Sequence, residues 1–358
     1  GLTHIDEMVQ SVRAVCPAGA TETRQLPASG AGPAEHRLYV GSEGCLGVIT
    51  EAWLRLRPRP ATRASATVVF AGADADAAFG RAARALHDMA QTGLAPANLR
   101  LVYGPEVART GGSGLGETER GMLASGAVLL IGFESPVGGQ SGAAILNTQM
   151  SMLLGIAESD AHGGAVVSSR LAGEGDAAGG EREGIAGSWG KGFMRGGYLF
   201  SASCLLPSML VNTIETACTW AAFPALHEAV LRTAREAVRR ECGVEGEVTC
   251  RITHVYPDGL APYYSIVVQG LPEEDVAPGA EDPRVRMWLA IKRDVMSAII
   301  ERGGTSTHHH AVGRLHQEHY EAESGALWHA SLAASKAVHD PAGIMSPGML
   351  VGNAASKL

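Results

Sequence analysis

The stretch GSEGCLGVIT, residues 41–50, places a glycine at every third position and then leads into an alternating apolar segment. Gly41, Gly44 and Gly47 have no side chains, so the backbone there can approach a flat or anionic ligand closely. Exposed amides in such a loop can bind a pyrophosphate or the carbonyl edge of a ring. A plain turn into a strand would carry the same glycines, and the stretch is neither a GxGxxG motif nor a Walker motif. The residues by themselves leave both interpretations open.

The segments around this loop predict short strands and a domain boundary. Residues 38–40 fit a short strand, and residues 48–56 alternate as a half-buried strand should. The two prolines within residues 57–60 end that pattern. We therefore expect one domain over residues 1–60 and a second domain from residue 61 onward.

Residues 61–305 predict an α+β domain in which helices cover an antiparallel sheet. A strand, a helix, two strands and a helix follow one another, and the same order returns in the second half. This order suggests two ferredoxin-like halves that share one sheet. Residues 162–197 are rich in Gly, Ala and Glu and show little periodicity, which favours a mobile loop or an active-site lid. Residues 306–358 form a further C-terminal segment.

The composition of the 358 residues argues against several classes of protein. A net charge of −8 offers no basic surface for nucleic acid. No apolar run reaches the roughly 18 residues that a transmembrane helix needs. The six cysteines form no CxxC pair, which indicates free thiols in a reducing, cytoplasmic compartment. The chain opens on GLTHIDEM without methionine, so we expect a fragment that lacks its N-terminal portion.

Three adjacent histidines, His308, His309 and His310, stand within GGTSTHHHAVGR, residues 303–314. A purification tag is excluded because a long stretch of sequence follows. Side chains on an extended segment alternate, so only His308 and His310 could share a metal ion, and no further ligand motif is near. We therefore predict no metal site. Imidazole exchanges protons near neutral pH, which favours an active-site role, while ordinary loop histidines are the alternative.

Two adjacent tyrosines, Tyr263 and Tyr264, follow a Pro-Asp-Gly turn on a predicted strand. Strand alternation turns one side chain inward and the other outward. Such pairs usually serve packing. A phenol, with a reference pKa of about 10, is a usable acid only when it is held neutral beside its target.

Taken together, four stretches resemble the vanillyl-alcohol oxidase/p-cresol methylhydroxylase superfamily of FAD enzymes, and within it the alkylglycerone-phosphate synthase (alkyldihydroxyacetonephosphate synthase) family. GSEGCLGVITEAWLRLRPRP, residues 41–60, is similar to the end of that family's FAD domain. GGTSTHHHAVGR is similar to its histidine segment, and HDPAGIMSPGML, residues 339–350, to the ending of FAD-linked oxidases. HVYPDGLAPYY, residues 254–264, resembles the segment with the family's proposed catalytic tyrosine.

The resemblance implies the C-terminal part of a PCMH-type FAD-binding domain followed by an FAD-linked-oxidase C-terminal cap domain. Residues 306–358 would return to the flavin site. The implied reaction exchanges the acyl group of acyl-dihydroxyacetone phosphate for the alkyl group of a fatty alcohol, through an adduct at flavin N5, in ether-lipid synthesis. Tyr263 would be the acid/base, and His308, His309 and His310 would be required for activity. The implied FAD contacts come from the loop residues Gly41, Ser42, Glu43, Gly44, Cys45, Leu46, Gly47, Val48 and Ile49.

Two departures from the family pattern bear on the substrate and the cofactor. Cys45 stands where the family has threonine, which removes a hydroxyl donor. The arginine expected to hold the substrate phosphate is missing from GGYLFSASC, residues 196–204, and Arg195 is the candidate substitute. The substrate is expected to be a small anion, with peripheral membrane contact and a homodimer as further expectations. An FAD-linked oxidoreductase of a 2-hydroxy acid or alcohol, and an inactive truncated module, are the alternatives.

Overall fold

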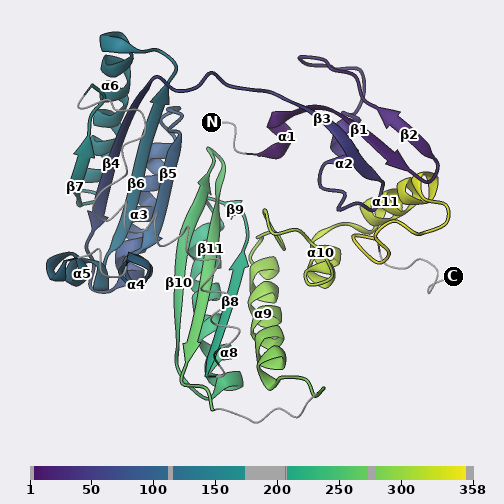
Figure 1. The fold of residues 1–358 in the computed structure, drawn as a ribbon. Coiled ribbons are helices and arrows are strands. Elements are labelled where there is room, and N and C mark those ends of the chain that lie inside the picture. The colour runs from purple at the N-terminus through teal and green to yellow at the C-terminus, as the bar shows by residue number, and fades with distance from the viewer. Residues whose placement is uncertain (1–3, 112–115, 174–205, 207, 273–278, 352–358) are drawn as a thin grey trace. The chain divides into compact units, whose positions relative to one another are not determined.

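The computed structural model describes residues 4–111, 116–173, 206, 208–272 and 279–351 (Figure 1). The chain divides into two compact units. Unit 1 joins Gly1–Pro58 with Thr305–Leu358, and unit 2 comprises Arg59–Gly304. The N-terminal and C-terminal segments, which are far apart in the sequence, therefore belong to one unit.

Unit 1 contains a three-stranded antiparallel sheet in the order β2-β1-β3, together with short helices. Its elements are α1 (Ile5–Met8), β1 (Val9–Cys16), β2 (Gly19–Glu22), α2 (His36–Tyr39), β3 (Val48–Leu54), α10 (Gln317–Glu323) and α11 (Ala326–His339). The core of the unit draws on both ends of the chain and includes Val12, Ala14, Leu46, Val312, Leu332 and Leu350. Neither segment alone supplies a complete core.

Two expectations for unit 1 are wrong. Residues 38–40, predicted as a strand, belong to the helical turn α2 and its end, where the Val40 N–H donates to the His36 carbonyl at 3.1 Å. The turn buries the Tyr39 ring, whose hydroxyl contacts His339 Nε2 on α11 at 2.9 Å. β3 forms where a strand was predicted, but it covers only Val48–Leu54 and is exposed along most of its length rather than half-buried, because the core of unit 1 packs on β1 instead.

Unit 2 is built on one antiparallel sheet in the order β7-β4-β6-β5-β10-β11-β8, with β9 beside β11. The strands are β4 (Thr62–Phe70), β5 (Asn98–Tyr103), β6 (Ala127–Ser135), β7 (Gly164–Arg170), β8 (Met209–Glu215), β9 (Cys218–Thr219), β10 (Gly246–Val255) and β11 (Gly259–Gln269). The helices are α3 (Ala75–Ala90), α4 (Gly104–Gly111), α5 (Glu117–Ala124), α6 (Gly139–Glu158), α8 (Phe223–Cys242) and α9 (Pro283–Glu301). The predicted α+β class with an antiparallel sheet and helices is confirmed.

The connectivity explains the repeated order in the sequence. The first half runs β4-α3-β5-β6-α6-β7, with α4 and α5 inserted before β6, and this is the ferredoxin-like arrangement. The second half runs β8-α8-β10-β11-α9, and its described residues contain no fourth strand beside β8. Instead, Trp288 Nε1 and Lys292 Nζ of α9 donate to the carbonyls of Val211 and Thr213 on β8, at 3.0 and 3.1 Å. Side chains of a helix thereby protect an edge strand from further pairing.

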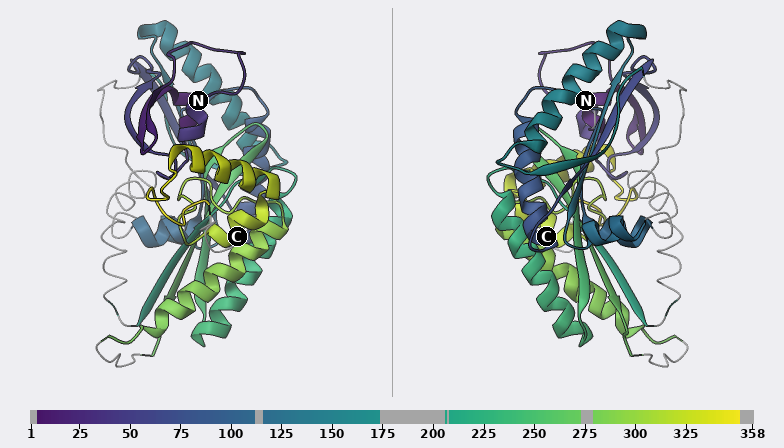
Figure 2. Two further views of the ribbon diagram at one scale, coloured as in Figure 1. Left: turned by 90° about the vertical axis from the view of Figure 1, so that its right-hand side faces the viewer. Right: turned by 90° about the vertical axis from the view of Figure 1, so that its left-hand side faces the viewer.

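The two faces of this sheet are covered differently. Helices α3, α6 and α8 lie on one face and enclose the main core with alternate strand residues such as Phe70, Leu129 and Tyr264 (Figure 2). Helices α4 and α5 lie on part of the other face, where a smaller cluster forms around Val102 and Val128.

One element replaces part of a predicted loop. Residues 164–170, expected to be irregular, form β7 and pair with β4. Glycine serves close packing here, because a Cβ on Gly164 would lie 2.8 Å from the Ala157 carbonyl oxygen. Glycine-rich composition therefore misled the prediction over this segment. Residues 174–197 of the expected loop, with Arg195, lie outside the described residues.

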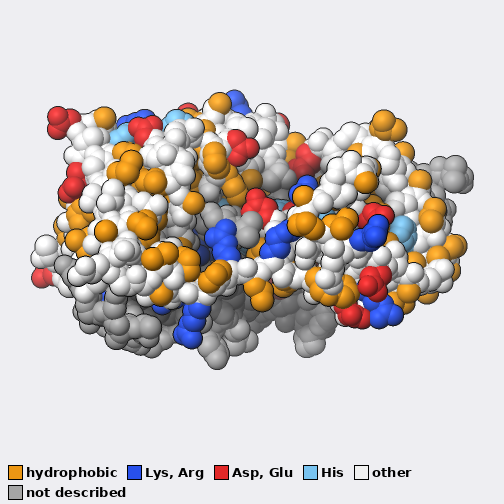
Figure 3. Space-filling view, turned by 90° about the horizontal axis from the view of Figure 1, so that it is seen from above, with side chains coloured by type: hydrophobic (Ala, Val, Ile, Leu, Met, Phe, Trp, Pro, Cys, Tyr) orange, Lys and Arg blue, Asp and Glu red, His pale blue; other side chains and the backbone are white. Residues whose placement is uncertain are grey.

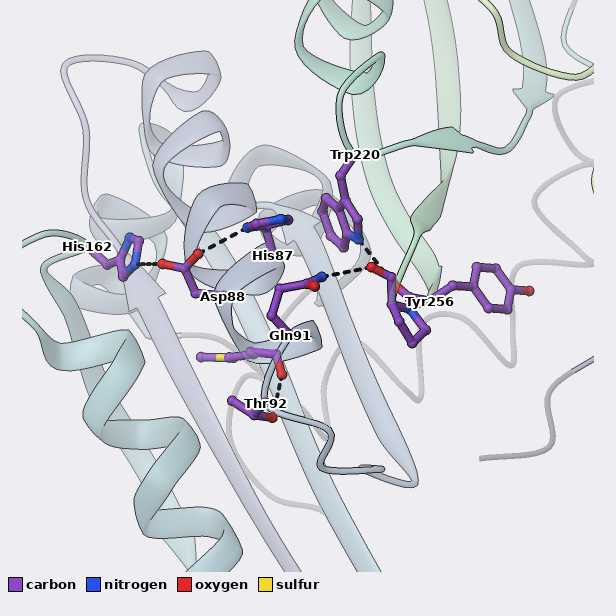
Figure 4. A network of polar contacts seen from close by, with 9 residues as sticks. His87, Asp88, Gln91, Thr92, His162, Trp220 and Tyr256 are labelled. Atoms are coloured by element: carbon purple, nitrogen blue, oxygen red, sulfur yellow. Dashed lines mark hydrogen bonds and ion pairs between the residues drawn. The ribbon is translucent and has the colours of Figure 1, made fainter.

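Polar side chains fix the C-terminal end of α3 (Figure 4). The Asp88 carboxylate contacts His87 Nδ1 at 3.0 Å and His162 Nε2 at 2.9 Å. Burial opposes ionisation of Asp88, but the two imidazoles hold the pKa of its carboxyl below the usual value. Gln91 Nε2 donates to the Pro257 carbonyl at 2.7 Å. The Asp88 contact ties the helix to the turn before β7, and the Gln91 bond ties it to the β10–β11 turn and so joins the two halves.

The surface is mixed in character. On the face seen from above in Figure 3, acidic, basic and hydrophobic side chains are interspersed. All five cysteines in the described part of the chain carry free thiols. Among the helices described, none combines the length and the apolar character that crossing a bilayer requires.

Candidate active site

The glycine loop between α2 and β3 owes its glycines to backbone conformation and to close contacts. Gly41, Gly44 and Gly47 have φ values of 83°, 76° and 145°, which disfavour any residue with a Cβ. A Cβ on Gly44 would lie 2.9 Å from Ser346 Oγ, and one on Gly47 would lie 2.9 Å from the Val15 carbonyl oxygen. A Cβ on Gly41 would meet nothing within 4 Å. Gly44 and Gly47 therefore serve packing inside unit 1, whereas Gly41 leaves open backbone.

Glu43 links this loop to the segment that follows the histidines. Its carboxylate accepts from the backbone N–H of Val312 at 2.6 Å and from that of Gly313 at 2.9 Å. Glu43 itself has a φ of 50°, a strained conformation for a residue other than glycine. Two hydrogen bonds to a charged acceptor offset that strain.

A lysine on α11 holds the next residue of the loop. Lys336 Nζ donates to the carbonyls of Cys45 at 3.1 Å and Met345 at 2.6 Å, and to Asp340 Oδ2 at 3.0 Å. The buried Asp340 carboxylate also accepts from the N–H groups of Ile344 and Met345. Burial works against ionisation of Asp340, but these donors hold the pKa of its carboxyl below the usual value. The C-terminal segment thus clamps the glycine loop.

Most side chains of the loop point into unit 1. Ser42, Cys45 and Leu46 are buried, and burial raises the pKa of the Cys45 thiol. Val48 and Ile49 are exposed. Replacing the family's threonine by Cys45 therefore changes a packed position rather than an exposed donor. The surface that the loop offers to a ligand is the backbone at Gly41 and the side chains of Val48 and Ile49.

The histidine run lies on a bent segment rather than an extended one. His308 Nδ1 lies 3.1 Å from His309 Nδ1, and their rings meet edge to face. The His309 and His310 rings are 4.7 Å apart, and His4 lies 6.3 Å from the His308 ring, centroid to centroid. The expectation of an extended segment, on which only His308 and His310 could share a metal ion, is therefore wrong, because the backbone bends and brings the His308 and His309 rings together. Sequence reasoning gave no signal for His4.

Two carboxylates anchor the backbone on either side of the run. Upstream, Glu323 on α10 accepts from the Ser306 N–H and, at 3.0 Å, from Thr305 Oγ1. Downstream, Glu43 binds the two amides after Ala311, whose φ is 73°. His316 Nδ1 donates to the Ala311 carbonyl at 2.8 Å. The three imidazoles are thus carried on a loop that is fixed at both ends.

The two predicted tyrosines lie on opposite faces of the sheet in unit 2. Tyr264 points into the main core, and burial raises its pKa well above the usual value. Tyr263 points to the other face, where the Arg251 guanidinium stacks on its ring with Cζ 3.8 Å from the ring centroid. Alternation separates the pair as predicted, although both rings are largely buried.

A buried polar chain runs from Tyr264 to the surface of unit 2. The Tyr103 hydroxyl donates to Asp76 Oδ1 at 3.0 Å, so it accepts from His227 Nε2 at 3.1 Å. His227 Nδ1 then accepts from the Tyr264 hydroxyl at 3.1 Å, and burial lowers the pKa of His227 to about 4. Arg235 binds both oxygens of Asp76 beside a surface pocket of about 340 Å³. No sequence motif indicates this series of hydrogen-bonded side chains.

A buried lysine also escaped sequence analysis. Burial lowers the pKa of Lys292 to about 8, and the nearby Glu215 carboxylate opposes that shift. Lys292 interrupts the apolar stripe of α9, which was the available signal. Its role at the edge of β8 accounts for its position.

The predicted site residues therefore belong to both units. The glycine loop and His308 to His310 lie together in unit 1, joined by Glu43. Tyr263 lies in unit 2, on the sheet face opposite the main helix layer.

A family model described as FAD linked oxidases, C-terminal domain, matches residues 59–350. The chain belongs to this family. The match covers all of unit 2 and most of the C-terminal part of unit 1. FAD is the cofactor that membership of an FAD-linked oxidase family implies.

Within the FAD-linked oxidases, the chain is similar to alkyldihydroxyacetonephosphate synthases. Identity is 23% to the protein of Caenorhabditis elegans and 24% to that of Trypanosoma brucei brucei, over 97% of this chain. These alignments cover 55% and 53% of the two relatives, so the chain spans about half of their length.

Two solved structures share the fold. An alkyldihydroxyacetonephosphate synthase superposes with a TM-score of 0.64 at 18% identity, over 96% of this chain and 54% of that one. The 4-ethylphenol oxidase from Gulosibacter chungangensis, in complex with isoeugenol, superposes with a TM-score of 0.65 at 13% identity, over 97% and 66%. Both confirm the fold class of an FAD-linked oxidase.

Proposed function

We propose that this chain is part of an FAD-dependent enzyme of the alkylglycerone-phosphate-synthase type. Such an enzyme would replace the acyl group of acyl-dihydroxyacetone phosphate by the alkyl group of a fatty alcohol. The observation that carries the proposal is the link through Glu43 between the glycine loop and the backbone that directly follows the histidine run. The similarity to alkyldihydroxyacetonephosphate synthases over nearly the whole chain supports it.

The glycine loop has the features that an FAD site needs. A Cβ at Gly41 would meet no atom within 4 Å, so the backbone there is open to a ligand. The exposed side chains of Val48 and Ile49 offer apolar surface to a flat ring. Glu43 and Lys336 hold the loop in this conformation through hydrogen bonds. We therefore propose that Gly41, Val48 and Ile49 contact FAD. Bound FAD would supply the electrophilic ring system at which the exchange of acyl for alkyl takes place.

The histidine run and Tyr263 would handle protons and charge. The bond between His308 Nδ1 and His309 Nδ1 requires one nitrogen to donate and the other to accept. The pair can therefore pass a proton from one ring to the other while it orients an anion. In this proposal Tyr263 is the acid/base, and the histidines hold the anionic group of the substrate.

The runner-up is an FAD-linked oxidoreductase that takes a hydride from a 2-hydroxy acid or an alcohol. The family description itself, FAD linked oxidases, favours this second candidate. Both candidates use the same glycine loop and the same acid/base residues. They differ in whether the flavin ends reduced.

The experiment uses the complete protein in its FAD-bound form. Acyl-dihydroxyacetone phosphate and a long-chain alcohol should yield the alkyl product and a free fatty acid without net bleaching of the flavin. Anaerobic bleaching by a hydroxy acid or an alcohol would instead favour the oxidoreductase. A protein that takes up no FAD would contradict both candidates.

A variant tests the assigned residue. Tyr263→Phe should abolish turnover while FAD stays bound, because only the hydroxyl is removed. The matched control is Tyr320→Phe, which removes the hydroxyl that accepts from Trp328 Nε1 at 2.7 Å in unit 1. Near-normal turnover in Tyr263→Phe would remove this phenol from the mechanism.

A further inference from the structure

We infer that Arg251, held by Glu106, is a positioning residue for Tyr263. This inference rests on the proposed acid/base role of Tyr263 and adds two residues that neither the sequence motifs nor the family pattern singled out. It concerns the polar face of the sheet in unit 2, opposite the main helix layer.

Strand register brings a row of polar side chains together on this face. Arg251 on β10 lies directly across from Tyr263 on β11, and Tyr263 lies directly across from Glu215 on β8. Residues opposite one another on neighbouring strands project to the same side of a sheet. Tyr263 is therefore flanked by a guanidinium on one strand and a carboxylate on the other.

Glu106 fixes the guanidinium from beneath. It lies on α4, which covers this face, and only 2% of its surface is exposed. Its Oε1 accepts from an Arg251 terminal nitrogen at 2.7 Å, and its Oε2 accepts from Thr249 Oγ1 at 2.9 Å. Both carboxylate oxygens are thus engaged, and the Arg251 side chain is 15% exposed. The plane of the guanidinium has little freedom to rotate.

The fixed guanidinium in turn restricts the phenol. Its Cζ lies 3.8 Å from the centroid of the Tyr263 ring, a stacked cation–π contact. Tyr263 is only 9% exposed, so the ring has few alternative orientations. A ring held in this way keeps its hydroxyl at one place.

Stability alone does not account for a buried ion pair at this place. A buried pair of charges contributes little net stability compared with apolar residues of similar volume. The same face already packs an apolar cluster around Val102, the neighbour of Arg251 on β5. Apolar residues could therefore have continued the cluster to Tyr263. The charged pair instead places a planar cation against one particular ring.

The experiment compares conservative variants in the FAD-bound protein. Arg251→Met keeps the length of the stem but removes the cation and should lower kcat by about 100-fold, the usual effect of misplacing a reacting group, with little change in KM. Arg251→Lys restores the charge without the planar stack and should recover only part of that loss. Glu106→Gln should lower kcat as well, because it removes the charge and turns one of the two accepting oxygens into a donor, so Arg251 and Thr249 compete for the single oxygen that remains.

A second ion pair between the same two elements supplies the matched control. Arg109 on α4 contacts Glu247 on β10 at 3.1 Å, away from Tyr263 and more exposed to solvent. Arg109→Met should leave kcat unchanged. If Arg251→Met and Arg109→Met had the same kcat, the positioning role would be refuted.

A readout without turnover separates this inference from the proposed function. With 3-fluorotyrosine at position 263, the fluorine resonance should shift and broaden in Arg251→Met and Glu106→Gln but not in Arg109→Met. An unchanged resonance in folded Arg251→Lys and Glu106→Gln would overturn the inference even if the enzyme acted on another substrate. Conversely, normal turnover in Tyr263→Phe together with a shifted resonance would refute only the acid/base role.

Discussion

The Glu43 carboxylate is expected to hold the backbone that follows the histidine run. In Glu43→Gln one oxygen still accepts from Val312 or Gly313, but the amide nitrogen faces the other backbone N–H. The variant therefore loses one charge-assisted hydrogen bond and leaves one donor without an acceptor. Because Glu43 is half-buried and water can compensate in part, the expected cost is about 2 kcal/mol, near the lower end for such bonds.

Amide hydrogen exchange measures this cost where it arises. A loss of about 2 kcal/mol corresponds to a roughly 30-fold change in a local opening equilibrium. The amides of Val312 and Gly313 should exchange faster by roughly that factor, whereas the amides of β1 should keep their protection. Glu51→Gln is the matched control, because Glu51 lies in the same unit and binds the Arg13 side chain at 2.7 Å. Unchanged exchange in Glu43→Gln, or equal acceleration in Glu51→Gln, would refute the reasoning.

Two further predictions concern stability. Burial lowers the pKa of His227 from 6.5 to about 4, so the unfolded chain takes up a proton at this residue first as the pH falls. The contribution of His227 to the free energy of unfolding of unit 2 should be fully present above pH 6.5 and decrease by up to about 3 kcal/mol towards pH 4. In urea unfolding, the free energy of unfolding of His227→Gln should therefore depend less on pH over this range, and an equal dependence would contradict the assignment. Gly47→Ala should destabilise unit 1 by about 2 kcal/mol, because the added methyl would lie 2.9 Å from the Val15 carbonyl oxygen; Gly41→Ala, with open space around its Cβ, should cost less in the same unfolding assay, and the reverse order would contradict this account.

Much of the fold followed from local patterns. The alternation of β11 separates Tyr263 from Tyr264, and the repeated order of strands and helices predicts the α+β class of unit 2. The predictions were wrong for residues 164–170 and 38–40, where local composition does not show the tertiary contacts of each segment. Gly164 pairs with β4 as part of a strand, and it is a glycine because β4 and α6 leave no space for a side chain. Tyr39 ends a helical turn, and its ring is buried against His339.

The sequence by itself determined the class of the fold, the glycine loop and the histidine run, because these depend on the order of neighbouring residues. Only the tertiary structure decided which side chains hold them. Glu43 lies 269 residues before Val312 in the chain, and Glu106 lies 145 residues before Arg251. Contacts at such separations depend on how the strands and helices pack, and no local periodicity encodes them. The structure therefore shows that Glu43 holds the backbone after the histidine run, and that Arg251 stacks on the Tyr263 ring.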